Sequence, residues 1–271
     1  MRGHLTLYRP GQSYLHQRNP LAKVLATAPA ITLVTITADP WPPVVFLGAA
    51  TALLLIGGRV PLGRYLLVVS LIAVIAFTHV PLYGLLARPE LDPTVVARLG
   101  PLRLTAGGVA VGLATALRIC ALASLALLYA FTTDVMDLVR ALVQQWHVSY
   151  RFGYGLLAAY RFVPMLETEL WTVQAAHRVR GVTHGWGPLG RLRALRRYAI
   201  PLLASAIRRA ERVALAMDAR AFGAFSTRTY RRRLRLALGD YALMTSCWLF
   251  TALAGVFLWQ VGLLTRLTIA P

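Results

Sequence analysis

Long apolar runs separated by short polar segments make up most of this chain, and runs of this kind are typical of helices that cross a membrane. Five runs stand out, of which the second is the shortest: Leu21–Ala38, Val44–Gly57, Tyr65–Leu86, Leu104–Phe131 and Leu236–Leu264. The pattern predicts an all-α fold, a polytopic membrane protein with about five transmembrane helices.

Between the fourth and fifth runs the pattern changes to amphipathic helices. The clearest is Tyr198–Gly223, where apolar residues recur at helical spacing and arginines occupy the other face. We predict Pro201 in its first turn and Gly223 as its cap. An upstream helix that ends at Arg180 repeats this design, because RFVPML in it is similar to YAIPLL at the start of Tyr198–Gly223. A shorter helix, Asp134–Trp146, follows two threonines that are suited to cap it.

The composition agrees with a membrane protein and adds a strong positive charge. Hydrophobic residues make up 57% and charged residues 14% of the 271 residues, and the formal net charge is +19. Eighteen arginines and four acids lie between Arg140 and Arg235, so this block carries +14 of that charge. Basic segments beside membrane spans are retained in the cytoplasm.

The charge and the apolar runs together predict the domain organisation and its orientation. Residues 1–20 form a cytoplasmic amino-terminal segment, and 21–131 carry transmembrane helices one to four. Residues 132–235 form a cytoplasmic domain of amphipathic helices, and 236–271 hold the final transmembrane helix and tail. The expected location is the cell membrane, with the amino terminus inside.

Nucleic acid is the other standard partner for such a basic chain. Cytoplasmic retention and attraction to anionic lipid headgroups account for most of the charge without it, so no nucleic-acid partner is expected. A membrane-anchored structural or polyanion-binding protein that uses the basic block remains the alternative function. Its binding would weaken steeply with salt.

Catalytic motifs are missing from the sequence. The six histidines form no metal-binding pair with a neighbouring acid, and neither GxxxxGK[ST] nor GxSxG occurs. Cys120 and Cys247 lie inside apolar runs and suggest no disulfide framework. We therefore expect a protein that is not an enzyme and that binds no metal or cofactor. An intramembrane enzyme, with polar side chains around one cavity, is a third alternative.

Two short arginine motifs are the candidate binding sites: Val179, Arg180 and Gly181, and Ala219, Arg220 and Ala221. Small neighbours let an arginine enter the groove of a partner, where its planar guanidinium pairs with carboxylates. The alternative is a cation that is favoured at a helix carboxyl end by the helix dipole. The repetition of the motif on similar helices favours docking to a partner that is itself two-fold.

Arg118 lies near the middle of the fourth apolar run, where an unpaired charge is costly. It is expected to pair with a carboxylate such as Asp240 or with a backbone carbonyl, or to face a partner protein. We assign it a structural role in helix packing, together with Pro164 and Pro201.

The two arginine motifs resemble the paired Ala-Arg-Gly-type motifs of the transmembrane T component of energy-coupling factor (ECF) transporters, the CbiQ-like family. Ser13, His16, Pro20 and Lys23 resemble the amino-terminal S-x-x-H-x-x-x-P-x-x-K pattern of that family, and Arg161 to Pro164 resemble its R-F-x-P step. Val179 replaces an alanine of the family pattern, and Ala221 stands where glycine or serine is common. Both replacements keep the motifs small.

The resemblance implies a subunit of an ECF-type ABC importer that couples ATP hydrolysis to uptake. Its partners would be two ATP-binding cassette ATPases, each receiving Arg180 or Arg220, and a substrate-binding S component in the bilayer. ATP and magnesium would be bound by the partner subunits. The substrate stays open among vitamins and transition-metal ions, because another subunit selects it.

Overall fold

The computed structural model describes residues 8, 11–86, 95–99, 102–181, 188–225, 229–230 and 232–264, which form two compact units. The first unit, here called the bundle, comprises the described residues from 8 to 141 and from 234 to 264. The second unit, here called the arms, comprises those from 142 to 233. Of the predicted cytoplasmic segment 1–20, residues 1–7, 9 and 10 lie outside the described residues.

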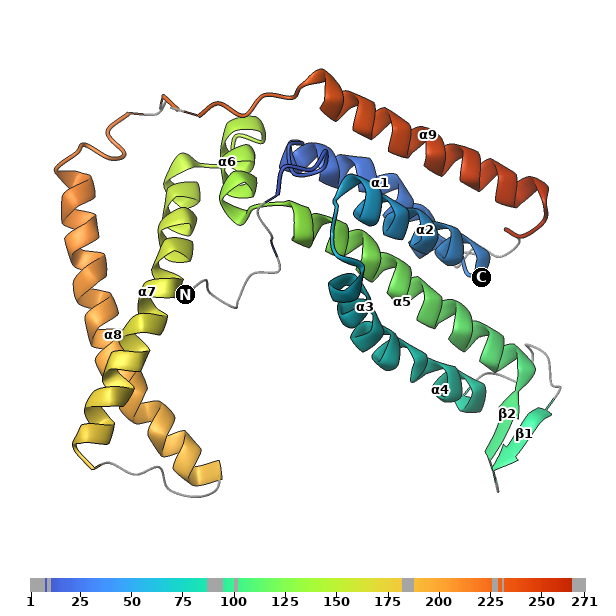
Figure 1. Cartoon of the computed structure of the whole chain (residues 1–271), viewed down its shortest axis with the longest axis horizontal. Helices are drawn as coiled ribbons and strands as arrows, with labels where there is room; N and C mark the ends of the chain where they lie inside the picture. The colour runs from blue at the N-terminus through green and yellow to red at the C-terminus, as the bar shows by residue number, and fades with distance from the viewer. Residues whose placement is uncertain are drawn as a thin grey trace. The chain divides into compact units, whose positions relative to one another are not determined.

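The bundle contains most of the apolar helices, which Figure 1 labels in chain order. Its helices are α1 (Pro20–Ile36), α2 (Trp41–Ala52), the π-helix η1 (Leu53–Gly57), α3 (Leu62–Phe77), α4 (His79–Leu86), α5 (Ala106–Thr132), the start of α6 (Val135–Gln145) and α9 (Leu238–Gln260). An antiparallel hairpin of β1 (Val95–Leu99) and β2 (Leu102–Thr105) precedes α5 and pairs Arg98 with Arg103. This hairpin is a small addition to an otherwise helical fold.

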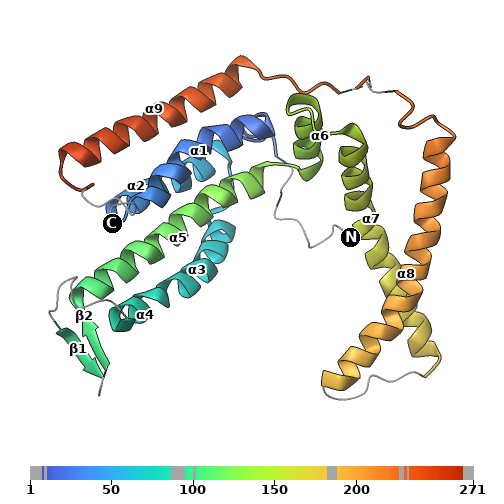
Figure 2. The same ribbon diagram turned by 180° about the vertical axis from the view of Figure 1, so that it is seen from behind.

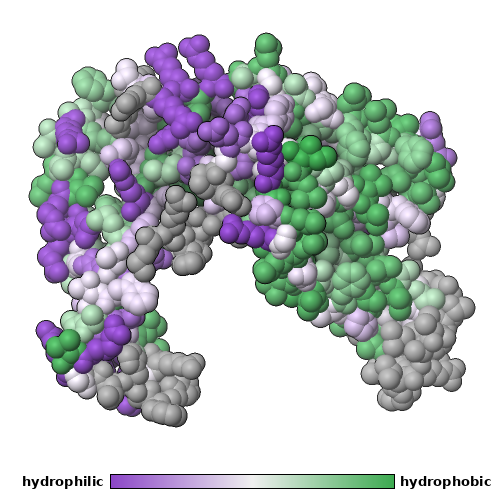
Figure 3. Space-filling model, in the orientation of Figure 1, coloured by the Kyte–Doolittle hydropathy of each residue, from purple (hydrophilic) through white to green (hydrophobic). Residues whose placement is uncertain are grey.

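The apolar runs of the sequence become these helices, and the predicted all-α polytopic fold is confirmed. Three described segments are long and apolar enough to cross a membrane: Leu62–Leu85, Ala106–Thr132 and Leu238–Gln260. Pro20–Ile36 and Trp41–Gly57 are shorter apolar helices. Large apolar side chains such as Leu67, Val74 and Phe257 are exposed, and apolar residues cover much of the bundle in Figure 3. A lipid-facing surface has this character.

Helix α5 lies at the centre of the bundle and packs against α1, α2, α3 and α4 (Figures 1 and 2). At Gly112 it approaches α4 so closely that a Cβ atom would lie 2.7 Å from the Cα atom of Val80. Farther along, the Ser124 hydroxyl lies 3.1 Å from the Tyr65 hydroxyl, which in turn lies 2.5 Å from Thr51. The missing side chain of Gly112 and the hydrogen bonds between these buried hydroxyls therefore allow the other helices to pack closely against α5.

The amino-terminal motif holds a buried cation at the carboxyl end of α5. Lys23 is 1% exposed, and its ammonium donates to the Thr132 carbonyl at 2.9 Å. It also donates to the hydroxyls of Thr132 and Thr133, at 3.3 and 3.2 Å. The last carbonyls of a helix carry partial negative charge, so this end favours an ammonium group. Lys23 thereby joins the first turn of α1 to the end of α5.

A carboxylate joins the same end of α1 to α9. The two oxygens of Asp240 accept hydrogen bonds from the backbone amides of Asn19, at 2.9 Å, and Ala237, at 2.8 Å. Asp240 is 2% exposed and close enough to Lys23 to interact with its charge. The Asn19 side chain caps α1 by accepting from the amide of Leu21 at 3.0 Å. Three helix ends therefore meet around two opposite charges.

Arg118 finds its partner at another helix end. Its guanidinium donates to the carbonyl of Thr37, the residue that caps the carboxyl end of α1. The structure thus shows the backbone-carbonyl alternative for Arg118, since Asp240 bonds instead to the amides described above. Lys23 and Arg118 therefore both bond to carbonyls at the ends of helices.

The arms consist of α7 (Tyr150–Val179) and α8 (Pro188–Asp218), which cross one another in Figures 1 and 2. The His177 and Tyr198 rings meet near the end of α7, with centroids 5.6 Å apart. The Tyr154 and Phe222 rings meet near its start, at 5.0 Å. The two helices are therefore antiparallel.

We expect Lys23→Met to lower the stability of the folded protein by about 2 kcal/mol, because it leaves the Thr132 carbonyl and Asp240 without a buried cation. Thermal unfolding of the purified protein in detergent, followed by tryptophan fluorescence, measures this. Arg64→Met removes an exposed cation near the start of α3 and is the matched control. Equal melting temperatures for both variants would contradict the structural role of Lys23.

Candidate functional site

The antiparallel arms place the two arginine motifs at opposite ends of the helix pair. Arg180 follows the last residue of α7, and Arg220 lies two residues beyond the end of α8. At 1.5 Å per residue, a helix of 30 residues is about 45 Å long, so the motifs are separated by tens of ångströms. The structure does not bring the two predicted sites together.

The Arg220 end has a well-defined backbone geometry. The amide of Phe222 donates to the carbonyl of Met217 at 3.0 Å, and the amide of Ala221 donates to that of Asp218 at 2.9 Å. This pair of bonds is a Schellman motif, in which one residue adopts the left-handed conformation. That residue is Ala221, with φ of 51°. The turn stops the helix directly after Arg220.

The Arg180 end repeats this geometry as far as the described residues extend. Arg180 is the capping residue, and the Gly181 amide donates to the Arg178 carbonyl at 3.0 Å. Gly181 has φ of 69°, the counterpart of Ala221. Both motifs therefore hold an arginine at the carboxyl end of a helix, followed by a small residue in the left-handed conformation.

All six motif residues are exposed. Val179 is 90% exposed, and Arg180, Gly181, Ala219, Arg220 and Ala221 also lie at the surface. Among the described residues, neither Arg180 nor Arg220 has an ion pair. A helix carboxyl end favours these cations, and exposure leaves both guanidinium groups available to a partner.

Several local predictions about the helix ends are wrong. Pro201 lies in the interior of α8 and not in its first turn, because the helix begins at Pro188. Pro164, to which only a role in helix packing was assigned, lies in the interior of α7. Ala221 rather than Gly223 occupies the left-handed position of the α8 cap. The side chain of Asp134, and not a threonine, accepts from the Met136 amide at 2.9 Å and caps α6.

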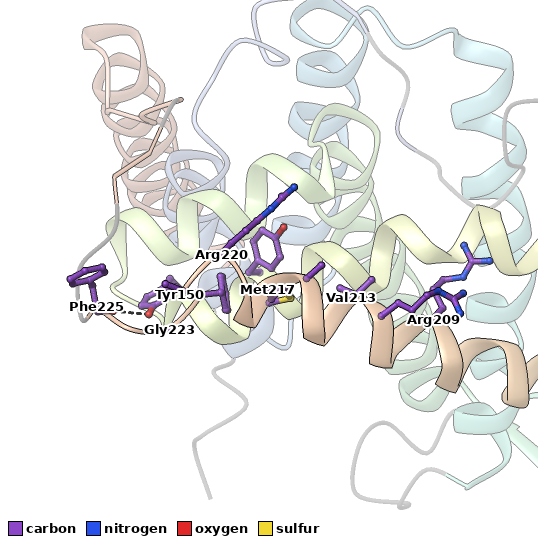
Figure 4. A pocket seen from close by; sticks show the side chains of 12 residues that line it. Tyr150, Arg209, Val213, Met217, Arg220, Gly223 and Phe225 are labelled. Carbon is purple, nitrogen blue, oxygen red and sulfur yellow. Dashed lines mark hydrogen bonds between the residues drawn. The ribbon is translucent and has the colours of Figure 1, made fainter.

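A groove beside Arg220 was not predicted from the sequence. Its volume is about 550 Å³, and its described lining combines three arginines with aromatic residues: Arg209, Arg212, Arg220, Tyr154, Phe222 and Phe225. Figure 4 shows Arg209, Val213 and Met217 in a row along α8, with Arg220 on the turn that follows the helix. The helical spacing of this row is readable from sequence. The contribution of Tyr150 and Tyr154, from the start of α7, is not.

Within the described part of the chain, no three histidines, cysteines or acids lie close enough together to hold a metal ion. The arms expose arginines and aromatic rings, which are enriched in protein interfaces.

Comparison with known proteins identifies the family. The family model described as "Cobalt transport protein" (CbiQ) matches residues 11–230. The chain belongs to the CbiQ family. It is 30% identical to the energy-coupling factor transporter transmembrane protein EcfT of Bacillus selenitireducens, with 90% of this chain and 93% of the relative aligned. It is 29% identical to EcfT of Heliobacterium modesticaldum, with 94% and 97% aligned.

These matches show that this CbiQ-family chain is a T component, the transmembrane component of an ECF transporter. The resemblance expected from the arginine motifs is thereby confirmed. The relative from Listeria innocua, 28% identical, aligns over 93% of this chain and 96% of its own length. The likeness therefore covers both the bundle and the arms.

Gly181 and Ala221 both adopt the left-handed conformation, so substitutions in opposite directions can be compared at the two positions. Alanine is strained by about 1 kcal/mol in this conformation relative to glycine. We therefore expect Ala221→Gly to stabilise the arms by up to this amount and Gly181→Ala to destabilise them. Hydrogen exchange of the backbone amides at the ends of α7 and α8 measures both effects. Changes of the same sign in both variants would contradict the assigned helix caps.

Proposed function

We propose that this T component is the energy-coupling scaffold of an ECF-type ABC importer. Two ATP-binding cassette ATPases dock on the arms, one at Arg180 and one at Arg220. A substrate-binding membrane subunit contacts the same chain and takes up a vitamin or a transition-metal ion. The ATPases bind ATP and magnesium, and this chain hydrolyses nothing.

The observation that carries the proposal is the matched geometry of the two arginine ends. Each arginine is exposed, ends a long helix and is followed by a small left-handed residue. A helix end of this shape fits a recess in a partner, where the guanidinium meets a carboxylate. Because α7 and α8 are antiparallel, the two ends face different partners, as a pair of ATPases requires.

An apolar stripe on α8 supports a second kind of contact. Ile200 is 60% exposed, Leu203 61% and Ile207 58%, at helical spacing along one face. Such a face favours an apolar partner surface, and we assign it to the substrate-binding membrane subunit. The arginine-rich arms and the amino terminus are cytoplasmic in this proposal, because basic segments are retained there.

Transport requires that nucleotide binding by the ATPases moves the ends of α7 and α8 that carry Arg180 and Arg220. ATPase closure on ATP moves Arg180 and Arg220, and α7 and α8 transmit this displacement towards the membrane-embedded helices. Nucleotide thus biases a two-state arrangement of the complex. The long uninterrupted helices suit this task, since each extends through an internal proline without ending.

Replacing both arginines tests the proposal directly. The Arg180→Glu, Arg220→Glu double variant should lose the ATPases from the purified complex and abolish uptake, because carboxylates of the partner would then meet like charges. Copurification, with the ATPases identified by mass spectrometry, and substrate uptake in cells are the measurements.

The control is the Arg196→Glu, Arg208→Glu double variant, which makes the same charge change at exposed positions of α8. It should retain both ATPases and uptake. If the two double variants behave alike, general charge rather than docking explains the result. Unchanged copurification and uptake in the first variant would exclude the proposed roles of Arg180 and Arg220.

A further inference from the structure

Contacts between residues of the arms that are far apart in the sequence shape the groove beside Arg220. The Arg151 guanidinium donates to the carbonyl of Gly223 at 2.6 Å, and the Tyr150 hydroxyl donates to that of Phe225 at 2.7 Å. The Phe222 ring lies 5.7 Å from Tyr150 and 5.0 Å from Tyr154. The segment after α8 is therefore fastened to the first turns of α7, and the groove lies between them.

The groove carries uncompensated positive charge. Its described lining contains Arg209, Arg212 and Arg220 and no acid. Arg209 has an acidic neighbour outside the lining, since its guanidinium lies 3.6 Å from the Glu169 carboxylate. Arg212 and Arg220 have no ion pair among the described residues. An occupant with one or two carboxylates complements this surface.

The rest of the lining is apolar and aromatic. Phe225 is 73% exposed and Tyr154 39%, and Met217 and Val213 form the floor along α8 (Figure 4). Arginine, tyrosine and methionine are enriched where proteins bind one another, and arginine and tyrosine dominate the binding energy there. A volume of about 550 Å³ has room for several side chains of a partner.

We propose that this groove receives a carboxylate-bearing, partly apolar segment of the ATPase that docks at Arg220. Contact at this end is then reciprocal: Arg220 enters the ATPase, and a segment of the ATPase enters the groove. The inference rests on the proposed function, since it presumes an ATPase at Arg220. It adds Arg212, Phe222 and Tyr154 to the docking surface, and it makes Arg151 a positioning residue.

Photocrosslinking tests who occupies the groove. p-Benzoylphenylalanine replaces Phe225, an aromatic residue of similar shape that lines the groove, or Phe152, which is exposed on α7 outside the described lining. In the complex of the full-length chain with its ATPases, we expect position 225 to crosslink to an ATPase peptide that contains Asp or Glu. Position 152 should not crosslink to that peptide. Crosslinks from 225 to lipid or to another membrane subunit would overturn the proposal.

Filling the groove gives an independent measurement. Ala216→Trp should weaken binding of the purified ATPases to the chain in nanodiscs about tenfold, the effect of losing one central contact. Ala214→Trp, at an exposed helix position outside the described lining, should leave binding unchanged. Arg212→Glu should weaken binding to a similar extent, while Arg208→Glu should not. Unchanged affinity in both Ala216→Trp and Arg212→Glu overturns the proposal.

The results separate this inference from the proposed function. If Arg220→Glu releases the ATPase while Ala216→Trp and Arg212→Glu do not affect it, the ATPase docks without using the groove. If none of these variants changes binding, ATPase docking at Arg220 is itself wrong. Arg151→Gln tests positioning: it should weaken binding and speed hydrogen exchange at residues 222–225, whereas loss of a direct contact alone would leave that exchange unchanged.

Discussion

A buried ammonium group is the interaction on which the bundle depends. Lys23 is surrounded by the last carbonyl of α5 and by two threonine hydroxyls, with the carboxylate of Asp240 nearby. Such a charge is tolerated in an apolar protein only where its hydrogen bonds are satisfied. The same site fixes the start of α1, the end of α5 and the start of α9. The chain continues from α5 into α6 and then into the arms. The contacts of Lys23 therefore also fix the end of α5 from which this connection begins.

Helix ends also explain how this chain accommodates its other charges. The guanidinium of Arg118 bonds to the carboxyl end of α1, and Arg180 and Arg220 each lie at the carboxyl end of their own helix. The helix dipole makes each of these ends favourable for a cation. The difference is exposure: the bundle cation is part of a packed structure, whereas the two arm arginines lie at the surface.

The sequence predicted the parts of this structure that depend on local pattern. Apolar runs located the membrane helices because lipid requires continuous apolar stretches, and repeated motifs located Arg180 and Arg220. The start of α8 at Pro188 was missed, since the predicted helix began at Tyr198 and the segment before it is rich in arginine. Arginine is a good helix former, so a charged segment can still be helical. Pro201 was therefore assigned to a first turn that lies farther upstream.

Contacts between distant residues could not be predicted. Nothing in the local sequence indicates that Arg151 bonds to Gly223, or that Phe222 packs on Tyr154, 68 positions away. Ala221 was missed as the left-handed residue because glycine, present two positions later, is the ordinary choice there. The groove depends on these contacts and so became visible only in the folded arms.

The ion pair between Arg209 and Glu169 marks the region where α7 and α8 contact one another. Arg220 lies eleven positions after Arg209, and Arg180 lies eleven positions after Glu169. At 1.5 Å per residue, each arginine is therefore about 16 Å along the chain from this contact. The two arginines are thus equally far from one ion pair, so a change in the angle between α7 and α8 at this pair displaces both arginines by the same amount.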